Sequence, residues 1–253
     1  MHDAGPSPYR SALHRLRAAQ KPARGTAAYS RLVNRPLGRR VAAYASTIGM
    51  TPDQATGLSA LCSGVGIAMI ALVQPTWWVG IVVGLALMAG YVMDSVDGQL
   101  ARLAGRGSVR GEWLDHTVDC IKTLTLHSAV LVAWFRWSPF DSTAALLIPL
   151  GYTIVASTTF FGWILMWSLR AKNPSAPAAP VDGDREHPLR MYLLLPTDYG
   201  ALCVAFLLLG FPSVFAVVYS FFFVAAAAAL ALALVKWWRE LTVVDSERSG
   251  IAG

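Results

Sequence analysis

The sequence predicts an all-α membrane protein with six transmembrane helices, preceded by an amphipathic N-terminal helix at the membrane interface. Three observations support this fold class. First, 55% of the 253 residues are hydrophobic and only 14% are charged, whereas soluble domains carry about 25% charged residues. Second, the apolar residues gather in six runs, and about twenty apolar residues suffice to cross a bilayer. Third, the basic residues are distributed unevenly between the connections of these runs, a bias that is typical of membrane proteins.

The first predicted span has a clear start. Thr51 can cap a helix, Pro52 suits the first helical position, and Gln54 completes a capping box. From this start the span runs to about residue 73. The other five cover approximately residues 77–101, 111–134, 144–169, 191–209 and 214–237.

The chain outside the spans divides into three segments. Residues 1–28 contain several arginines and prolines, a composition that predicts a flexible basic tail. Residues 29–48 interleave apolar side chains with arginines, which predicts an amphipathic helix in the membrane interface, although Pro36 would bend or interrupt it. We therefore expect a six-helix transmembrane domain over residues 49–238, followed by a C-terminal tail over residues 239–253.

Charge predicts the orientation of the spans. With the N-terminus in the cytoplasm, 19 of the 21 lysine and arginine residues fall in cytoplasmic segments. Only Arg136 falls outside, and Lys122 lies within a span. The positive-inside rule therefore places both termini in the cytoplasm, and we expect the chain in the plasma membrane. The net charge of +6 is explained by this distribution and forms no basic face, so no nucleic-acid partner is expected.

Four aspartates stand near the cytoplasmic ends of the second and third spans. Asp94 and Asp97 are three residues apart and Asp115 and Asp119 are four apart, so each pair shares one face of its helix. Because the two helices are antiparallel and closely connected, all four side chains can meet at a similar depth. Charged groups within a span are costly, and two divalent cations would neutralise the cluster. Oxygen ligands favour Mg²⁺, with Mn²⁺ or Ca²⁺ as alternatives, and such ions indicate phosphate chemistry.

Neighbouring residues fit a ligand that carries phosphate. Gly98 and Gly111 remove side chains beside the carboxylates, where a ligand could approach the backbone. Arg102 offers a guanidinium fork for phosphate at the end of the second span. The sequence therefore predicts an anion-binding pocket next to the metal site.

These residues form the pattern D-x₂-D-G-x₂-A-R-x₈-G-x₃-D-x₃-D, which resembles the signature of the CDP-alcohol phosphotransferase family. Every fixed position is matched, by Asp94, Asp97, Gly98, Ala101, Arg102, Gly111, Asp115 and Asp119. The similarity extends to the six-helix architecture and to the T-P-x-x-x-T start of the first span, and it covers about residues 29–238. Asp53 departs from the asparagine that is common in this start.

The resemblance implies a role for each of these residues. The four aspartates would hold two metal ions, and Asp119 would also be the base that deprotonates the attacking hydroxyl. The pocket for CDP would be formed by Asp53, Thr56, Gly98, Ala101, Arg102, Ser108 and Gly111. The implied reaction transfers a phosphatidyl group from CDP-diacylglycerol to a polar alcohol and releases CMP, in phospholipid biosynthesis. The family often forms homodimers, so a homodimer is expected.

The alcohol acceptor lies outside the shared motif. Lys122 follows Asp119 by three residues and points toward the same cavity, where it either contacts the acceptor or forms an ion pair with Asp198 or with the aspartate cluster. Arg170 and Arg190 either meet an acceptor phosphate or only anchor the spans at the cytoplasmic surface. These three cations favour a phosphorylated acceptor such as inositol phosphate or glycerol phosphate.

Two alternative functions are considered. A soluble CDP-alcohol could donate to a lipid or sugar-alcohol acceptor, which reverses the two substrates. A cation transporter would also use intramembrane aspartates, but it predicts carboxylates near the bilayer midplane on broken helices. The aspartates here lie near one surface and are followed by glycine and arginine, which favours the enzyme.

Overall fold

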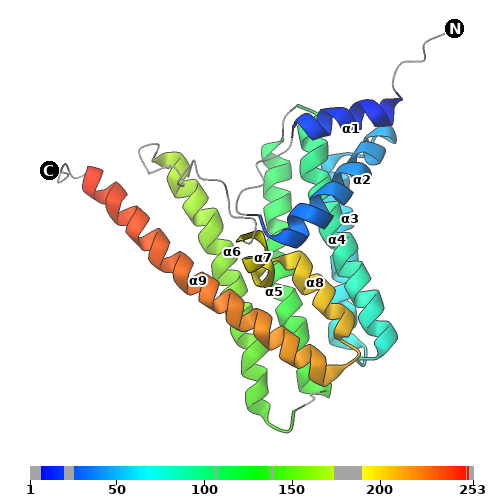
Figure 1. The fold of residues 1–253 in the computed structure, drawn as a ribbon, viewed down its shortest axis with the longest axis vertical. Coiled ribbons are helices and arrows are strands. Elements are labelled where there is room, and N and C mark those ends of the chain that lie inside the picture. The colour runs from blue at the N-terminus through cyan, green and yellow to red at the C-terminus, as the bar shows by residue number, and fades with distance from the viewer. Residues whose placement is uncertain are drawn as a thin grey trace.

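The computed structural model describes residues 7–19, 26–105, 107–137, 140–173, 190–248 and 250, and within these ranges it contains helices and turns but no strands. A π-helical turn, Ser30–Asn34, leads into the second helix, and 3-10 turns at Thr143–Leu146, Leu195–Thr197 and Phe206–Leu208 separate others. The α-helices are α1 Pro8–Ala18, α2 Arg35–Thr47, α3 Pro52–Leu72, α4 Trp77–Leu103, α5 Val109–Trp137, α6 Leu147–Lys172, α7 Arg190–Leu193, α8 Tyr199–Ala205 and α9 Pro212–Arg248 (Figure 1).

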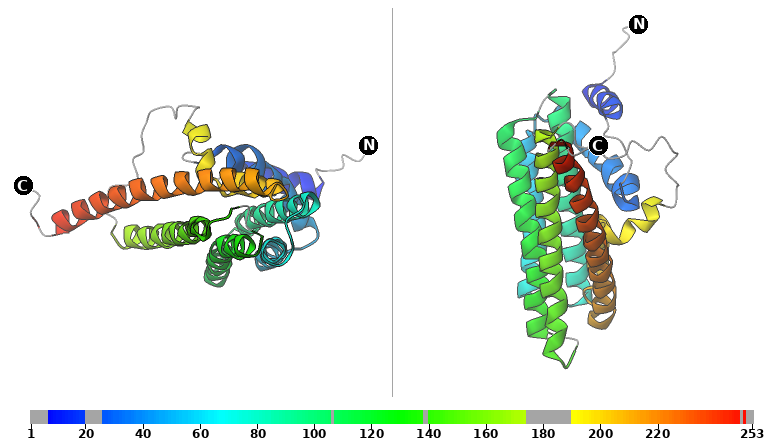
Figure 2. Two further views of the ribbon diagram at one scale, coloured as in Figure 1. Left: turned by 90° about the horizontal axis from the view of Figure 1, so that it is seen from below. Right: turned by 90° about the vertical axis from the view of Figure 1, so that its left-hand side faces the viewer.

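Five of the described helices are long and apolar enough to cross a membrane, namely α3, α4, α5, α6 with the turn before it, and α9. Helices α3, α4 and α5 form one bundle, α6 lies against α5, and the long α9 runs obliquely past α6 (Figures 1 and 2). The prediction of an all-helical protein is confirmed for the described residues, which include five candidate membrane-spanning helices.

The start of α3 follows the expected capping box. Gln54 N donates to Thr51 Oγ1 at 3.2 Å, and Thr51 N donates to Gln54 Oε1 at 3.0 Å. Farther along, α3 approaches α4 so closely that a Cβ added at Gly90 would lie 2.1 Å from Ser63 Oγ. Small residues permit such an approach between membrane helices. The capping box and this contact place α3 beside the end of α4 that carries the aspartates.

The segment 191–209, which we predicted as one span, is divided in the structure. After α7, the turn Leu195–Thr197 contains Pro196, which has no N–H to continue a helix. Asp198 then starts α8, because its carboxylate accepts a hydrogen bond from Gly200 N at 2.9 Å. The same carboxylate accepts from Ser30 N, also at 2.9 Å. Asp198 therefore joins this segment to the turn before α2 and is not a partner of Lys122 in the contacts described.

The N-terminal region is more ordered than the expected tail over residues 1–28. Residues 8–18 form α1, which begins after Ser7, whose side chain accepts from Arg10 N. Leu16 is completely buried, and Arg15 Nη2 donates to the carbonyl oxygen of Leu103 at 2.7 Å. These contacts hold α1 against the C-terminal end of α4. Residues 1–6 and 20–25 lie outside the described ranges.

The predicted boundaries also differ at the C-terminus. Helix α9 continues to Arg248, so most of the segment 239–253, expected as a tail, prolongs the last membrane helix. A bidentate ion pair between Arg170 on α6 and Glu240 on α9 links the two helices here, with 2.5 Å between Arg170 Nε and Glu240 Oε1 and 2.7 Å between Arg170 Nη2 and Glu240 Oε2.

The main core lies where α3, α4, α5, α8 and α9 meet. His127 on α5 is hydrogen-bonded through Nδ1 to the hydroxyl of Tyr219 at 2.7 Å and stacks on Tyr152 with 3.8 Å between ring centroids. All three side chains are buried. A polar group buried in this way is tolerated because it has a hydrogen-bond partner, and the cluster joins α5, α6 and α9.

Candidate functional site

Three of the four predicted aspartates converge between α4 and α5. One carboxylate oxygen each from Asp94, Asp115 and Asp119 lies within 4.8 Å of the others. Asp94 comes from α4, and the other two come from one face of α5 because they are four residues apart. A carboxylate offers only acceptor oxygens, so this arrangement suits a hard divalent cation.

Asp97 lies one helical turn along α4 from Asp94 and is 6% exposed. Thr56 Oγ1 donates to its Oδ2 at 2.7 Å, and Gly98 N donates to its Oδ1 at 2.5 Å. These bonds orient the carboxylate beside Asp94 and Asp115, with which it interacts electrostatically. Asp97 is not among the three residues whose oxygens converge most closely, but it extends the acidic centre toward α3.

Lys122 forms an ion pair with the aspartate cluster, one of the alternatives that the sequence left open. Its Nζ lies 2.5 Å from Asp94 Oδ1, 2.7 Å from Asp119 Oδ1 and 3.2 Å from Ser59 Oγ. A lysine ammonium has three N–H donors, and these three contacts use them all. The four carboxylates still outnumber this ammonium by three, so the centre retains a strongly negative charge that bound cations would neutralise.

A cavity of about 730 Å³ opens beside this centre. Asp97 and Asp115 lie on its wall, so a ligand in the cavity contacts the acidic centre directly. Six of the seven residues predicted to bind CDP line it. The lining residues are Thr51, Pro52, Asp53, Thr56, Asp97, Gly98, Ala101, Ala104, Gly107, Ser108, Arg110, Gly111, Glu112, Asp115, His116 and Trp167.

Two glycines, Gly98 and Gly111, lie on the wall of this cavity. A Cβ added at Gly111 would lie 2.9 Å from Ser108 Oγ and 3.3 Å from Asp53 Oδ1, and one added at Gly98 would lie 3.6 Å from Arg102 Nη1. A side chain at Gly111 would therefore crowd the two neighbours that share the wall with it. A Cβ at Gly98 would make only an ordinary van der Waals contact, so the role of the two glycines as places of close ligand approach stays a prediction.

Arg102, the seventh residue predicted to bind CDP, is not among the residues that line the cavity. One of its N–H donors is nevertheless unpaired. Its Nε is buried without a hydrogen-bond partner among the described residues. A buried donor left unsatisfied is costly. Another atom of the same guanidinium, Arg102 Nη1, lies 3.6 Å from the position of a Cβ added at Gly98, which is on the cavity wall.

Half of the sixteen residues that line the cavity were not assigned to the site from the sequence, among them Arg110 and Trp167. Arg110 Nη2 lies 2.5 Å from Asp53 Oδ2 and joins the start of α5 to the start of α3. Arg110 falls within the eight-residue gap of the motif, and its positive charge was the one signal in the sequence that could have indicated a role. Trp167 comes from α6, and nothing in the sequence placed α6 near the pocket.

The other two predicted cations are Arg170 and Arg190. Arg170 is paired with Glu240 of α9. Arg190 begins α7, but its side chain lies outside the described residues. The structure therefore brings Lys122 to the acidic centre, while the described contacts of Arg170 are to another helix.

Fold and site together define a multi-pass membrane protein with an acidic centre beside a cavity that faces one end of the helical bundle. The family model of CDP-alcohol phosphatidyltransferase matches residues 49–238. The chain belongs to this family.

Two similar proteins refine the comparison. The archaetidylinositol phosphate synthase of Pyrococcus horikoshii is 31% identical over 106 residues, which are 42% of this chain and 53% of that relative; the chain thus spans about half the length of the relative. The structure of the phosphatidylinositol phosphate synthase of Mycobacterium tuberculosis, in complex with manganese and citrate, matches with a TM-score of 0.51 and 19% identity. The match covers 78% of this chain and 87% of the mycobacterial chain, and it shows that the two proteins have a similar fold.

Proposed function

We propose that this protein is a metal-dependent phosphotransferase of phospholipid biosynthesis. It transfers a phosphatidyl group from CDP-diacylglycerol to a polar alcohol and releases CMP. The observation that carries the proposal is the convergence of Asp94, Asp115 and Asp119 within 4.8 Å, in a membrane protein whose family is shown by the match over residues 49–238.

The acidic centre would hold two divalent cations, Mg²⁺ in the first place and Mn²⁺ as an alternative. Asp94, Asp97, Asp115 and Asp119 are the proposed ligands. All four supply oxygens, and their charge exceeds that of Lys122, so they fit hard cations. When bound, these ions stabilise negative charge on the phosphate oxygens as the bond to CMP breaks.

The donor would lie in the cavity beside this centre. Its CMP part would contact the wall formed by α3, α4 and the start of α5, and the residues proposed for this are Asp53, Thr56, Gly98, Ala101, Arg102, Ser108 and Gly111. The free Nε donor of Arg102 supports a phosphate contact. Thr56 acts on the metal centre as well, because its hydroxyl orients Asp97.

The chemistry requires a proton acceptor next to the attacking oxygen. We propose that Asp119 takes the proton of the acceptor hydroxyl while that oxygen forms a bond to the phosphorus of the phosphatidyl group. The bond from this phosphorus to the CMP oxygen breaks, and CMP leaves with the electron pair. Lys122 holds Asp119 in place through the 2.7 Å ion pair, which makes it a positioning residue in this scheme.

For the acceptor we propose a phosphorylated polyol of the inositol phosphate type, with glycerol phosphate as the alternative to exclude. The support is the name of the archaeal relative, an archaetidylinositol phosphate synthase. An acceptor phosphate needs a cation that has a free donor. Arg190 remains a candidate, whereas the guanidinium of Arg170 is engaged by Glu240.

Replacing Arg170 by Gln should therefore affect stability and leave acceptor binding unchanged. Breaking a partly exposed ion pair costs about 1 kcal/mol, so we expect a midpoint of thermal denaturation in detergent that is a few degrees lower. The KM of the acceptor should stay within about twofold of its original value. Glu240→Gln is the matched control and should give the same shift. A KM that rises in Arg170→Gln alone would assign Arg170 to the acceptor.

We propose six membrane crossings, the fifth being the broken segment 191–209. The support is that Leu202, Cys203 and Phe206 of this segment are buried in the main core, among the other helices. Residues 29–48 would lie in the interface on the cytoplasmic side. Both termini and the site would face the cytoplasm, as the distribution of Lys and Arg indicates. We place the enzyme in the plasma membrane. The enzyme would act as a homodimer.

The decisive experiment measures CMP release by the purified protein in detergent. With Mg²⁺, CDP-diacylglycerol and inositol phosphate, we expect CMP and a phosphodiester lipid in equal amounts, and excess EDTA should abolish both until Mg²⁺ is restored. Serine, glycerol phosphate and free inositol serve as alternative acceptors, and a soluble CDP-alcohol with diacylglycerol tests the reversed substrates. No CMP release from CDP-diacylglycerol with any acceptor would refute the proposal.

A further inference from the structure

Helix α1 lies outside residues 49–238, the region that the family model matches. It packs on α2 and on the end of α4 (Figure 1). Leu16 is completely buried and belongs to a core cluster with residues of α2 and α4. One directed bond fixes the contact, because Arg15 Nη2 donates to the carbonyl oxygen of Leu103 at 2.7 Å. Helix α1 therefore has a defined place on the transmembrane bundle.

The bond from Arg15 restrains the C-terminal end of α4. The last carbonyl groups of an α-helix have no partner within the helix and need one from outside. The carbonyl of Arg102 accepts from Gly105 N at 3.2 Å, in the turn that ends α4, and the carbonyl of Leu103 accepts from Arg15. A positive charge is also favourable here, because the helix dipole makes a C-terminus partly negative. Without the Arg15 side chain, the last turn of α4 loses both effects.

This end of α4 forms one wall of the cavity proposed for CDP. Ala101 and Ala104 line the cavity, as do Gly107 and Ser108 in the connection that follows. Gly105 ends the helix with a φ of 82°, and a Cβ added at Gly105 or Gly107 would meet no atom within 4 Å. At these two positions the connection has no packing contacts that would hold it. Its position therefore depends on how its two ends are fixed.

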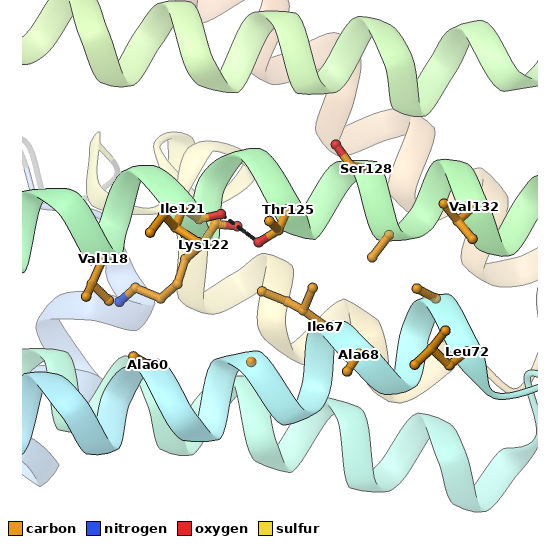
Figure 3. Close-up of a pocket in the computed structure, with 13 residues that line it drawn as sticks. Ala60, Ile67, Ala68, Leu72, Val118, Ile121, Lys122, Thr125, Ser128 and Val132 are labelled. Atoms are coloured by element: carbon orange, nitrogen blue, oxygen red, sulfur yellow. Dashed lines mark hydrogen bonds between the residues drawn. The ribbon is translucent and has the colours of Figure 1, made fainter.

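The α5 end of the connection is fixed to α3. Arg110 Nη2 lies 2.5 Å from Asp53 Oδ2 and joins the start of α5 to the start of α3. Figure 3 shows the two helices side by side over residues 60–72 of α3 and 118–132 of α5, which line a cavity of about 530 Å³ between them. Helix α1 takes no part in these contacts. The α4 end of the connection, in contrast, is fixed by Arg15.

We propose that α1 sets the affinity of the enzyme for the nucleotide part of its donor. Arg15 is a positioning residue, which acts through the Leu103 carbonyl and keeps Ala101 and Ala104 in place against the bound CMP group. The inference rests on the proposed function, because it assumes that CMP occupies this cavity. It gives a role in the reaction to a segment outside the region that the family model matches.

The effect of Arg15 is on binding and not on the rate of the chemical step. Asp97, the proposed metal ligand nearest to this end of α4, lies six residues before Leu103, which is about 9 Å along the helix. Its carboxylate is oriented by hydrogen bonds of its own, from Thr56 Oγ1 and Gly98 N. Loss of the Arg15 bond should therefore loosen the nucleotide wall and leave the acidic centre in place.

The test is Arg15→Ala. We expect the KM of CDP-diacylglycerol and the Kd of CMP, measured by calorimetry in Mg²⁺, to rise about fivefold, the effect of losing one hydrogen bond. The kcat and the acceptor KM should stay within about twofold. Arg15→Lys keeps a charge and an N–H donor and should restore most of the affinity for CMP. The matched control is Arg17→Ala, at another exposed position of α1, which should change none of these values.

Several results would overturn the inference. They are an unchanged donor KM and CMP Kd in Arg15→Ala, the same rise in Arg17→Ala, and a parallel change of kcat and both KM values. The last of these would assign α1 a structural role only. Hydrogen exchange gives a second measurement, since the amides of residues 101–108 should exchange faster in Arg15→Ala while those of α3 do not; equal exchange in both proteins contradicts the inference. If the unaltered protein releases no CMP from CDP-diacylglycerol, the proposed function fails instead, and the Kd of CMP still tests the role of Arg15.

Discussion

Replacing Asp119 by Asn should reduce CMP release by at least about 1,000-fold. The change removes two things at once: a charged ligand from the group whose oxygens lie within 4.8 Å, and the proposed acceptor of the proton from the attacking hydroxyl. General base catalysis alone contributes about 10²- to 10⁴-fold. Asn has nearly the same size as Asp, so the packing of α5 against α4 should persist. CMP release at saturating donor and acceptor is the measurement.

The two roles of Asp119 can be separated by metal concentration. Asp94→Asn loses a ligand but no base, so a higher concentration of Mg²⁺ or Mn²⁺ should restore part of its activity. Asp119→Asn should not respond in this way. Asp141→Asn, an exposed aspartate in the α5–α6 connection, controls for the loss of a carboxylate as such and should be fully active. If Asp119→Asn keeps more than a tenth of the original activity, Asp119 is not the base.

The fold was predictable where local chemistry determines it. The start of α3 followed from three adjacent residues, Thr51, Pro52 and Gln54, because a capping box needs no partner elsewhere in the chain. The division of the segment 191–209 was not predicted, although Pro196 and Asp198 both lie in it. Its apolar composition suggested one span, and the second role of Asp198, the bond to Ser30 N, joins residues 168 positions apart.

The site was predictable to the extent that helix periodicity determines it. The spacings of the aspartates placed each pair on one helix face, and the short α4–α5 connection brought the faces together, as the approach of Asp94 to Asp115 and Asp119 shows. Pairing of cations was not predictable in the same way. Arg170 forms an ion pair with Glu240 on α9, and Arg110 forms one with Asp53 on α3. Both pairs depend on how separate helices pack against each other. The residue pattern within one helix carries no information about that packing.

Replacing Lys122 by Met should destabilise the acidic centre without removing any of the proposed metal ligands. The ammonium contacts Asp94 at 2.5 Å and Asp119 at 2.7 Å. Without it the two carboxylates repel each other, and removal of one partner from a buried ion pair costs about 3 kcal/mol or more. The side chains of Asp94 and Asp119 are 24% and 30% exposed to solvent. We therefore expect a smaller loss in the free energy of unfolding, of about 1 to 2 kcal/mol. The midpoint of thermal denaturation in EDTA should fall, and Mg²⁺ should raise it more than in the original protein.

The kinetics of Lys122→Met distinguish positioning from acceptor binding. All three N–H donors of Lys122 are engaged by Asp94, Asp119 and Ser59, so an acceptor could be bound only by displacing one of them. A misplacement of about 1 Å in a catalytic group can cost about 100-fold in rate. We therefore expect kcat to fall by about that factor while the acceptor KM stays within about twofold. Lys236→Met, at an exposed position on α9, should alter neither value. A KM that rises tenfold at unchanged kcat would make Lys122 an acceptor-binding residue, and the ammonium would then have to leave an aspartate whenever the acceptor binds.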